Sequence, residues 1–134
     1  MKSNNLNTRE KELMELLWNS DDALTSVEML EKLDSDNWNK LSVFRTINGL
    51  IKKECIVVNG LEQYNTQYAR KFTYALTREE YMAKLMREDG MGLESLGNVA
   101  LALLGDEMPD SKKEKDALIN NLQAIIDDLK NHKK

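Results

Sequence analysis

The sequence has few of the residue types that metal sites, disulfide scaffolds and many active sites need. It contains one cysteine (Cys55), one histidine (His132) and one proline (Pro109). A lone cysteine excludes an internal disulfide and a cysteine-rich metal cluster. A lone histidine beside lysines at the end of the chain offers neither a set of metal ligands nor an oriented catalytic base. We therefore expect no metal, no cofactor and no enzyme activity.

Long apolar runs are also missing. The longest strongly apolar stretch, residues 99–104, is far shorter than the roughly 20 residues that span a membrane, and the polar start of the chain has no signal-peptide core. A chain of 134 residues that is 41% hydrophobic and 31% charged is typical of one folded domain, or of a small domain with an extension. We expect a cytoplasmic protein without membrane insertion.

Acidic residues outnumber basic ones in the whole chain but not in its middle. The formal net charge is −4. Residues 1–37 sum to −5 and residues 79–134 to −4, whereas residues 38–78 carry seven basic and two acidic side chains, a sum of +5. Such an asymmetry indicates an anionic partner for the middle segment. A mixed, merely solvated surface is the alternative that charge alone leaves open.

The first part of the chain predicts three short helices. Asn7 and Thr25 each precede a glutamate by three residues, the spacing of a capping box that begins a helix. A third helix is predicted over residues 39–54, because apolar residues recur there at i, i+4, i+7 and i+8. Its apolar face comprises Val43, Ile47, Leu50 and Ile51, and its opposite side carries Leu41, Ser42, Arg45, Asn48, Gly49 and Lys52.

A change of period after residue 54 predicts a small β-hairpin. The β-branched run 55–58 and the segment 72–76 are typical of strands, and we expect a polar loop over residues 61–71 between them. Three helices followed by a hairpin is the order of a winged helix-turn-helix domain. The predicted fold class is mainly α with a small β-hairpin, and further helices follow it.

The helices predicted after the hairpin need a partner. Thr77 begins another capping box, an apolar helix is expected over residues 93–104, and Ser111 begins a last helix whose apolar residues alternate by four and three. So short a repeat does not form an autonomous coiled coil. The last two helices must therefore bury their apolar sides against the body of the protein or against a second copy.

Side chains on the outward side of helix 39–54 suit recognition of DNA in the major groove. The guanidinium of Arg45 can donate two hydrogen bonds to a guanine edge, while lysines contact phosphates without recognising sequence. We predict base contacts from Ser42, Arg45, Thr46 and Asn48, and phosphate contacts from Lys40, Lys52, Lys53, Arg70 and Lys71. A small domain whose basic helix is merely solvated is the alternative interpretation.

Motifs spread over residues 6–88 point to one protein family. They are Thr8-Arg9-Glu10, Leu13 through Trp18, Trp38, Ser42-Val43, Ile47, Leu50-Ile51, Lys53, Phe72-Thr73-Tyr74, and Thr77 through Tyr81. In these motifs the chain resembles the penicillinase-repressor family of the BlaI/MecI/CopY type. The resemblance implies a homodimeric winged-helix repressor that holds a palindromic operator in double-stranded DNA and dimerises through its C-terminal helices.

The chain departs from the family pattern at several positions. Gly49 stands where the family usually has arginine, and Glu54 stands where it usually has glycine. Some relatives are induced when the signal of a sensor protease leads to cleavage of an Asn-Phe bond, and residues 97–104, GNVALALL, lack that bond. Copper-responsive relatives use a cysteine cluster, which this chain also lacks. A sensor protease or another inducing partner is left open.

Together these patterns predict a sequence-specific transcriptional regulator. We assign residues 6–78 to a winged helix-turn-helix DNA-binding domain and residues 79–134 to a helical dimerisation region. Dimerisation contacts are expected from Leu96, Val99, Leu103, Leu118, Leu122, Ile125 and Leu129. The alternative function is a winged-helix protein-interaction module without sequence-specific DNA binding, which the acidity of the whole chain favours.

Cys55 is the one residue for which we weigh a sensing role. It lies inside an apolar run, where a cysteine is expected to be a buried small hydrophobe. The neighbouring Lys52 and Lys53 could lower its pKa, so oxidation sensing is the alternative.

Overall fold

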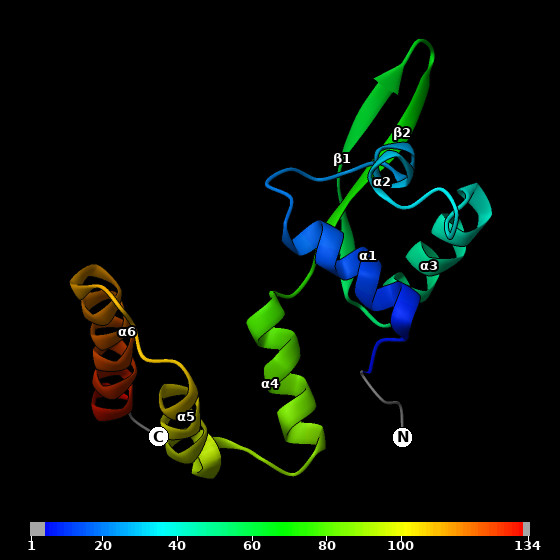
Figure 1. Cartoon of the computed structure of the whole chain (residues 1–134). Coiled ribbons are helices and arrows are strands. Elements are labelled where there is room, and N and C mark those ends of the chain that lie inside the picture. Colours follow the sequence, from blue (N-terminus) through cyan, green and yellow to red (C-terminus); the bar gives the residue numbers. More distant parts are fainter. Residues whose placement is uncertain (1–4, 133–134) are drawn as a thin grey trace. The chain divides into compact units, whose positions relative to one another are not determined.

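The computed structural model describes residues 5–132 and divides into two compact units, one ending at Met91 and one beginning at Gly92 (Figure 1). The first unit contains α1 (Thr8–Trp18), α2 (Ser26–Lys32), α3 (Lys40–Lys52), β1 (Ile56–Tyr64), β2 (Gln67–Tyr74) and α4 (Arg78–Glu88). The second unit contains a 3₁₀ helix (Leu93–Ser95), α5 (Leu96–Asp106) and α6 (Lys112–Asn131). The division follows α4, whereas the boundary predicted from the sequence precedes it, at residue 78.

The helices begin where short polar side chains satisfy free backbone N–H groups. The capping boxes at Asn7, Thr25 and Thr77 are confirmed: each side chain accepts a hydrogen bond from the N–H three residues on, and the glutamate there accepts one from the cap in return. Asn39 caps α3 in the same way, with Ser42 as its reciprocal partner. Caps of this kind are each worth about 1 kcal/mol, and they fix where α1, α2 and α3 begin.

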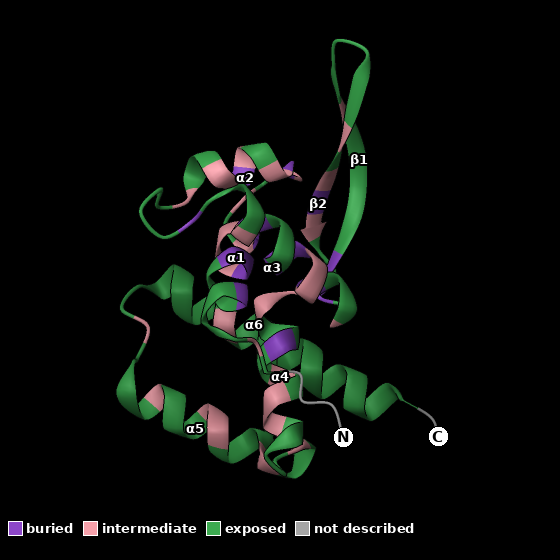
Figure 2. Ribbon diagram, turned by 90° about the vertical axis from the view of Figure 1, so that its right-hand side faces the viewer, coloured by how far each residue is buried: buried purple, intermediate pink, exposed green. Residues whose placement is uncertain are grey.

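The core of the first unit lies between α1, α2, α3 and the base of the hairpin. Its fully buried hydrophobic side chains are Leu13, Met14, Leu17, Met29, Val43 and Leu50. Figure 2 shows the hairpin exposed over most of its length and buried only near its base. The outward side of α3 is therefore held on a packed scaffold, while the hairpin projects from it.

The buried side of α3 differs from the prediction at one position. Ile51, expected inside, is 38% exposed, whereas Thr46 is only 7% exposed. Thr46 lies between Val43 and Ile47 on the helix and completes an inward stripe at i, i+3, i+4 and i+7 with Leu50. Its hydroxyl donates a 2.8 Å hydrogen bond to the Ser42 carbonyl, which removes the cost of burying it.

The polar loop predicted over residues 61–71 is wrong, because these residues form most of the hairpin. β1 and β2 pair antiparallel from Ile56 opposite Tyr74 to Tyr64 opposite Gln67. Between the strands lies a two-residue turn in which Asn65 has a positive φ of 56°, a conformation that asparagine adopts more readily than most residues. The register shifts once, between Val58 and Leu61, where Gly60 has φ 106°.

The base of the hairpin is tied to the helices. Leu24, between α1 and α2, exchanges two backbone hydrogen bonds with Phe72 of β2, of 2.9 and 2.7 Å. Three helices, this bridge and the long hairpin make the first unit a winged helix-turn-helix domain, as the sequence predicted. The hairpin is the wing of that fold.

Helix α4 packs on α1 through a cluster of aromatic and charged groups. The Trp18 and Tyr81 rings lie with centroids 5.8 Å apart, and the Trp18 indole N–H donates to the Leu76 carbonyl at 3.0 Å. Arg78 forms an ion pair with Glu15 and lies over the Trp18 ring. Tyr81 is also buried, and its hydroxyl accepts a hydrogen bond from the Leu6 N–H. These contacts explain why α4 belongs to the first unit.

The second unit exposes the apolar side chains of its helices. No described residue of α5 or α6 is buried. All seven residues predicted for dimerisation lie on these two helices and are at least partly exposed: Leu96, Val99, Leu103, Leu118, Leu122, Ile125 and Leu129. Within residues 5–132 no helix has both the length and the apolar character needed to cross a membrane.

Candidate nucleic-acid interface

Helix α3 presents one continuous outward side to solvent. Since the helix advances about 100° per residue, the side opposite Val43 and Leu50 carries Leu41, Arg45, Asn48 and Lys52. Lys40 begins the helix at the edge of this side and is exposed. The outward orientation predicted for Arg45, Asn48 and Lys52 therefore agrees with the structure, with Asn48 half-buried.

Arg45 has the geometry of a free hydrogen-bond donor. Its side chain is exposed, and within residues 5–132 it forms neither an ion pair nor a side-chain hydrogen bond. It lines a shallow groove at the start of α3 whose other lining residues are Arg9, Asn39, Leu41, Ser42 and Thr46. A guanidinium held on a rigid helix beside a groove can form two parallel hydrogen bonds to one planar acceptor pair.

The two hydroxyl residues predicted to contact bases are already engaged inside the protein. Thr46 is buried and donates to the Ser42 carbonyl at 2.8 Å. Ser42 is half-buried, and its Oγ accepts from the Asn39 N–H at 2.8 Å and donates to the Asn39 carbonyl at 3.0 Å. Ser42 therefore stabilises the start of α3, whereas the Thr46 hydroxyl is satisfied within the helix.

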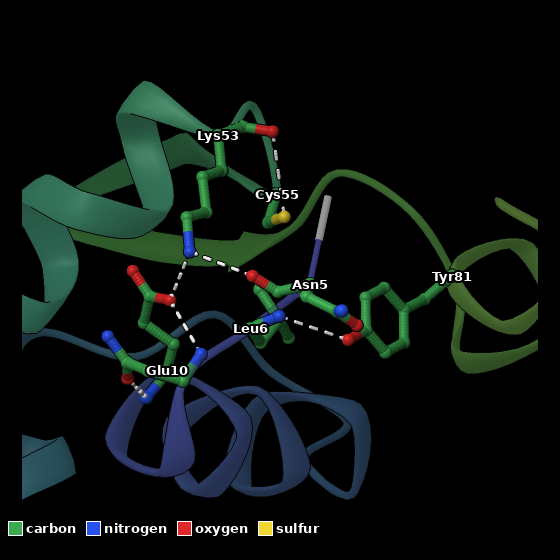
Figure 3. Close-up of polar contacts among 7 residues, drawn as sticks. Asn5, Leu6, Glu10, Lys53, Cys55 and Tyr81 are labelled. Carbon is green, nitrogen blue, oxygen red and sulfur yellow. Dashed lines mark hydrogen bonds and ion pairs between the residues drawn. The ribbon is translucent and has the colours of Figure 1, made fainter. Parts of the chain in front are cut away.

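Lys53 differs from Lys52 although the two are adjacent. Its ammonium lies 2.6 Å from Glu10 Oε1 and donates to the Asn5 carbonyl at 2.9 Å, as Figure 3 shows. Glu10 is only 5% exposed, so the pair joins the end of α3 to α1 in a partly buried setting. Lys52 is exposed and has no such ion pair within the described chain.

Gly49 leaves room for this ion pair. A Cβ atom added to Gly49 would come within 2.7 Å of Glu10 Oε2. Real Cβ atoms do not approach so closely, and the long side chain that the family usually has at this position would displace the Glu10 carboxylate. Gly49 therefore faces α1 and not the outward side predicted for it, and it leaves room for the Glu10–Lys53 contact.

The wing carries its positive charge on β2, away from its tip. Arg70 is exposed, with its guanidinium 5.4 Å from the centroid of the Phe72 ring. Lys71 is half-buried and lies near Glu28 of α2. The pKa of Glu28 is lowered, chiefly by the hydrogen bond from the Thr25 backbone and to a smaller extent by the charge of Lys71. The tip consists of uncharged side chains, from Tyr64 to Tyr68.

Sequence reasoning missed two residues at this surface. Arg9 of α1 donates to the Asn37 carbonyl at 2.6 Å and lies over the Trp38 ring, and it shares the groove with Arg45. Phe44 is 54% exposed next to Arg45. The basic character of Arg9 was visible in the sequence, but only the fold brings it beside α3.

Cys55 has the environment of an inert thiol. Its side chain is buried, and burial raises the pKa of the thiol above its ordinary value, despite smaller opposing effects from Lys84 and Lys53. A thiol with a raised pKa forms little of the reactive thiolate at neutral pH. Among residues 5–132 there is also no cluster of histidine, cysteine or carboxylate groups that could hold a metal ion.

Comparisons with solved structures give regulators at low identity. The chain is similar to Staphylococcus aureus MarR in complex with salicylate and kanamycin, with 14% identity over 96% of this chain and 77% of that chain and a TM-score of 0.43. It is similar to the adhesin competence repressor AdcR of Streptococcus pyogenes, with 17% identity over 93% and 81% and a TM-score of 0.40. PerR of Streptococcus pyogenes matches with 8% identity over 52% of this chain and 47% of that chain, at a TM-score of 0.42, so the chain spans about half the length of PerR.

A family model identifies the family of this chain, although the curated proteins do not. No curated protein sequence matches the chain. The model of the family described as Penicillinase repressor matches residues 6–127, which cover most of both compact units. The chain therefore belongs to the penicillinase-repressor family of winged-helix transcriptional regulators.

Proposed function

We propose that this protein is a homodimeric repressor that inserts α3 into the major groove of a palindromic operator and blocks transcription in the cytoplasm. The observation that carries the proposal is the exposed guanidinium of Arg45, unpaired among the described residues. It is exposed at the middle of the outward side of α3, without an ion pair in the described chain, and lies between the exposed Lys40 and Lys52. A free guanidinium flanked by cations matches a guanine edge flanked by phosphates.

The contacts we propose are fewer than those predicted from the sequence. Arg45 and Asn48 contact base edges, with Ser42 at the border of the groove. Thr46 is left out because it is buried and its hydroxyl is engaged. Phosphates are contacted by Lys40, Lys52 and Arg70, with Lys71 near the base of the wing, whereas Lys53 is left out because it pairs with Glu10.

Dimerisation is proposed to occur through the second unit. Leu122, Ile125 and Leu129 recur along α6 at intervals of three and four residues and are exposed, as are Leu101 and Leu103 of α5. An apolar side of this length is costly in water, and a second copy covers it by the same residues on both chains. A twofold dimer presents two copies of α3, so its operator repeats one half-site in inverted orientation.

The experiment that tests this function is selection from a pool of randomised duplex DNA, followed by binding measured by fluorescence anisotropy at two salt concentrations. We expect the protein to enrich a palindrome and to bind it less tightly at high salt. Arg45→Ala should weaken binding by about 1–3 kcal/mol and relax base preference. Lys52→Ala should weaken all sequences equally and reduce the salt slope by about 1.

A protein-interaction module is the second candidate, and the acidity of the chain outside residues 38–78 favours it. The same selection experiment distinguishes the two candidate functions. If the protein retains no DNA even at low salt, the repressor function is contradicted and the protein-interaction module is supported. Release from DNA by a sensor protease or another inducing partner stays a prediction.

A further inference from the structure

The outward side of α3 carries two large apolar side chains that internal packing does not explain. Leu41 and Phe44 are each 54% exposed. Side chains of this kind are mostly buried in folded proteins, and both lie on a well-packed helix whose opposite side forms the core. Because they adjoin each other and the exposed Arg45, they form a contiguous patch that a ligand approaching α3 would cover.

Leu41 and Phe44 belong to one patch with the polar residues of the interface. On a helix, residues three and four apart are neighbours, so Leu41 adjoins Phe44 and Arg45, and Phe44 adjoins Asn48. Leu41 and Arg45 also line the same groove. We call these four residues the α3 recognition patch: Leu41, Phe44, Arg45 and Asn48. It occupies the first part of the helix, which in helix-turn-helix proteins contacts base edges.

The charges around the patch favour DNA over an apolar protein surface. Lys40 and Arg45 flank Leu41 and Phe44, Lys52 follows about two turns further along α3, and none of these cations forms an ion pair within the described chain. An apolar protein partner would have to desolvate these cations without compensation, whereas the major groove supplies a guanine edge for Arg45 and phosphates at its rims for the two lysines. The groove floor supplies one apolar group, the 5-methyl group of thymine.

We propose that Phe44 and Leu41 recognise the 5-methyl groups of thymines that lie next to the base contacted by Arg45 in each half-site. This inference rests on the proposed function and adds which bases the operator contains. Arg45 and Asn48 form hydrogen bonds, while the two apolar side chains exclude water from the methyl groups. Cytosine and uracil at these positions lack the methyl group, so the patch discriminates against both.

The test compares thymine with uracil, which differ only in the methyl group. Duplexes enriched from the randomised pool are synthesised twice, once with thymidine and once with deoxyuridine in the half-sites, and anisotropy titrations are run with the full-length protein. We expect affinity to fall about fourfold for each contacted methyl group that is removed, the value of one buried apolar carbon. Equal affinity for the two duplexes would overturn the proposal and leave DNA binding intact.

Two variants test whether the α3 recognition patch causes the difference in affinity between the thymidine and deoxyuridine duplexes. Phe44→Ala should bind the thymidine duplex about fourfold more weakly per half-site than the wild type does, and should lose the part of the difference between the duplexes that Phe44 supplies, while Leu41 keeps the rest. Lys52→Ala is the matched control, because it should weaken both duplexes equally and keep their ratio. If Phe44→Ala keeps the full ratio, or changes only the oligomeric state, the assignment is overturned. If the wild type binds neither duplex at low salt, the proposed function fails with it.

Discussion

Two adjacent lysines at the end of α3 have different surroundings and should have different effects when removed. Lys53 pairs with the nearly buried Glu10, whereas Lys52 extends into solvent. Lys53→Ala leaves a buried carboxylate without its cation, so we expect the free energy of unfolding to fall by about 1–3 kcal/mol. Lys52→Ala should change it by less than about 0.5 kcal/mol. Urea unfolding measures both.

The same pair of variants separates stability from DNA binding. Lys52→Ala should weaken binding to every duplex, while folded Lys53→Ala should keep most of its affinity, because its ammonium faces α1. Equal stability of the two variants would contradict the structural role of the Glu10–Lys53 contact.

Cys55 should react slowly with thiol reagents in the native state. Because burial raises its pKa, the thiolate fraction at pH 7 is smaller than in an exposed cysteine, and the sulfur is also shielded. We expect iodoacetamide to modify the folded protein much more slowly than the urea-unfolded protein, and the rate to rise with pH. Rapid modification at pH 7 that abolishes DNA binding would instead support oxidation sensing.

For single residues, the sequence predicted which side of α3 a side chain lies on better than whether its polar group is free to bind DNA. Helical periodicity placed Arg45, Asn48 and Lys52 outward because they lie opposite an apolar stripe. It misplaced Thr46 and Ile51, since a threonine can satisfy its hydroxyl within the helix and take an inward position that an isoleucine was expected to hold. The engagement of Lys53 by Glu10 involves residues 43 positions apart, which local periodicity does not connect.

Helix α3 ends in a conformation that suits glycine, but the residue there is Glu54. Its φ is 61°, and the Cys55 N–H donates to the Leu50 carbonyl while the Glu54 N–H donates to the Ile51 carbonyl, the two bonds of a Schellman motif. Glu54→Gly removes both the steric cost of this conformation and an anion at a helix C-terminus. We expect stability to rise by about 1 kcal/mol.

Glu54→Ala is the control for this prediction, because it removes the charge and keeps the strained backbone. It should recover only a small part of the gain in a urea unfolding midpoint. If alanine stabilises as much as glycine, the charge and not the backbone conformation is the cause.

Among the elements, helices were predicted well and the wing poorly. A capping box depends only on a residue and the glutamate three positions later, so it can be read directly from the sequence. The structure confirms the three predicted at Asn7, Thr25 and Thr77. The outer hairpin is a polar, exposed ribbon with a register shift at Gly60, so it lacks the regular apolar alternation from which strands are predicted. Residues 61–71 therefore resembled a loop although they are paired.

On the scale of the whole molecule, the two units differ in whether they bury their apolar side chains. The first has a closed core, whereas the second leaves the apolar side of α6 exposed in the single chain. The sequence could not decide between burial against the body and burial against a second copy, because both need the same spacing. Leu122, Ile125 and Leu129 stay exposed within the second unit itself, and the proposed dimer would cover them.

Ile125→Asp tests this at the centre of the apolar side of α6. A carboxylate there would be desolvated in a dimer interface but costs little in the single chain, where Ile125 is exposed. We expect a folded monomer by size-exclusion chromatography with light scattering and unchanged helical circular dichroism. Asn120→Asp adds the same charge on the opposite side of α6 and should remain dimeric. Loss of folding in Ile125→Asp alone would mean that the residue packs within its own chain.

A monomer contacts only one half-site, so its affinity for the palindrome should fall to that for a single half-site, because the second α3 is no longer held at high local concentration.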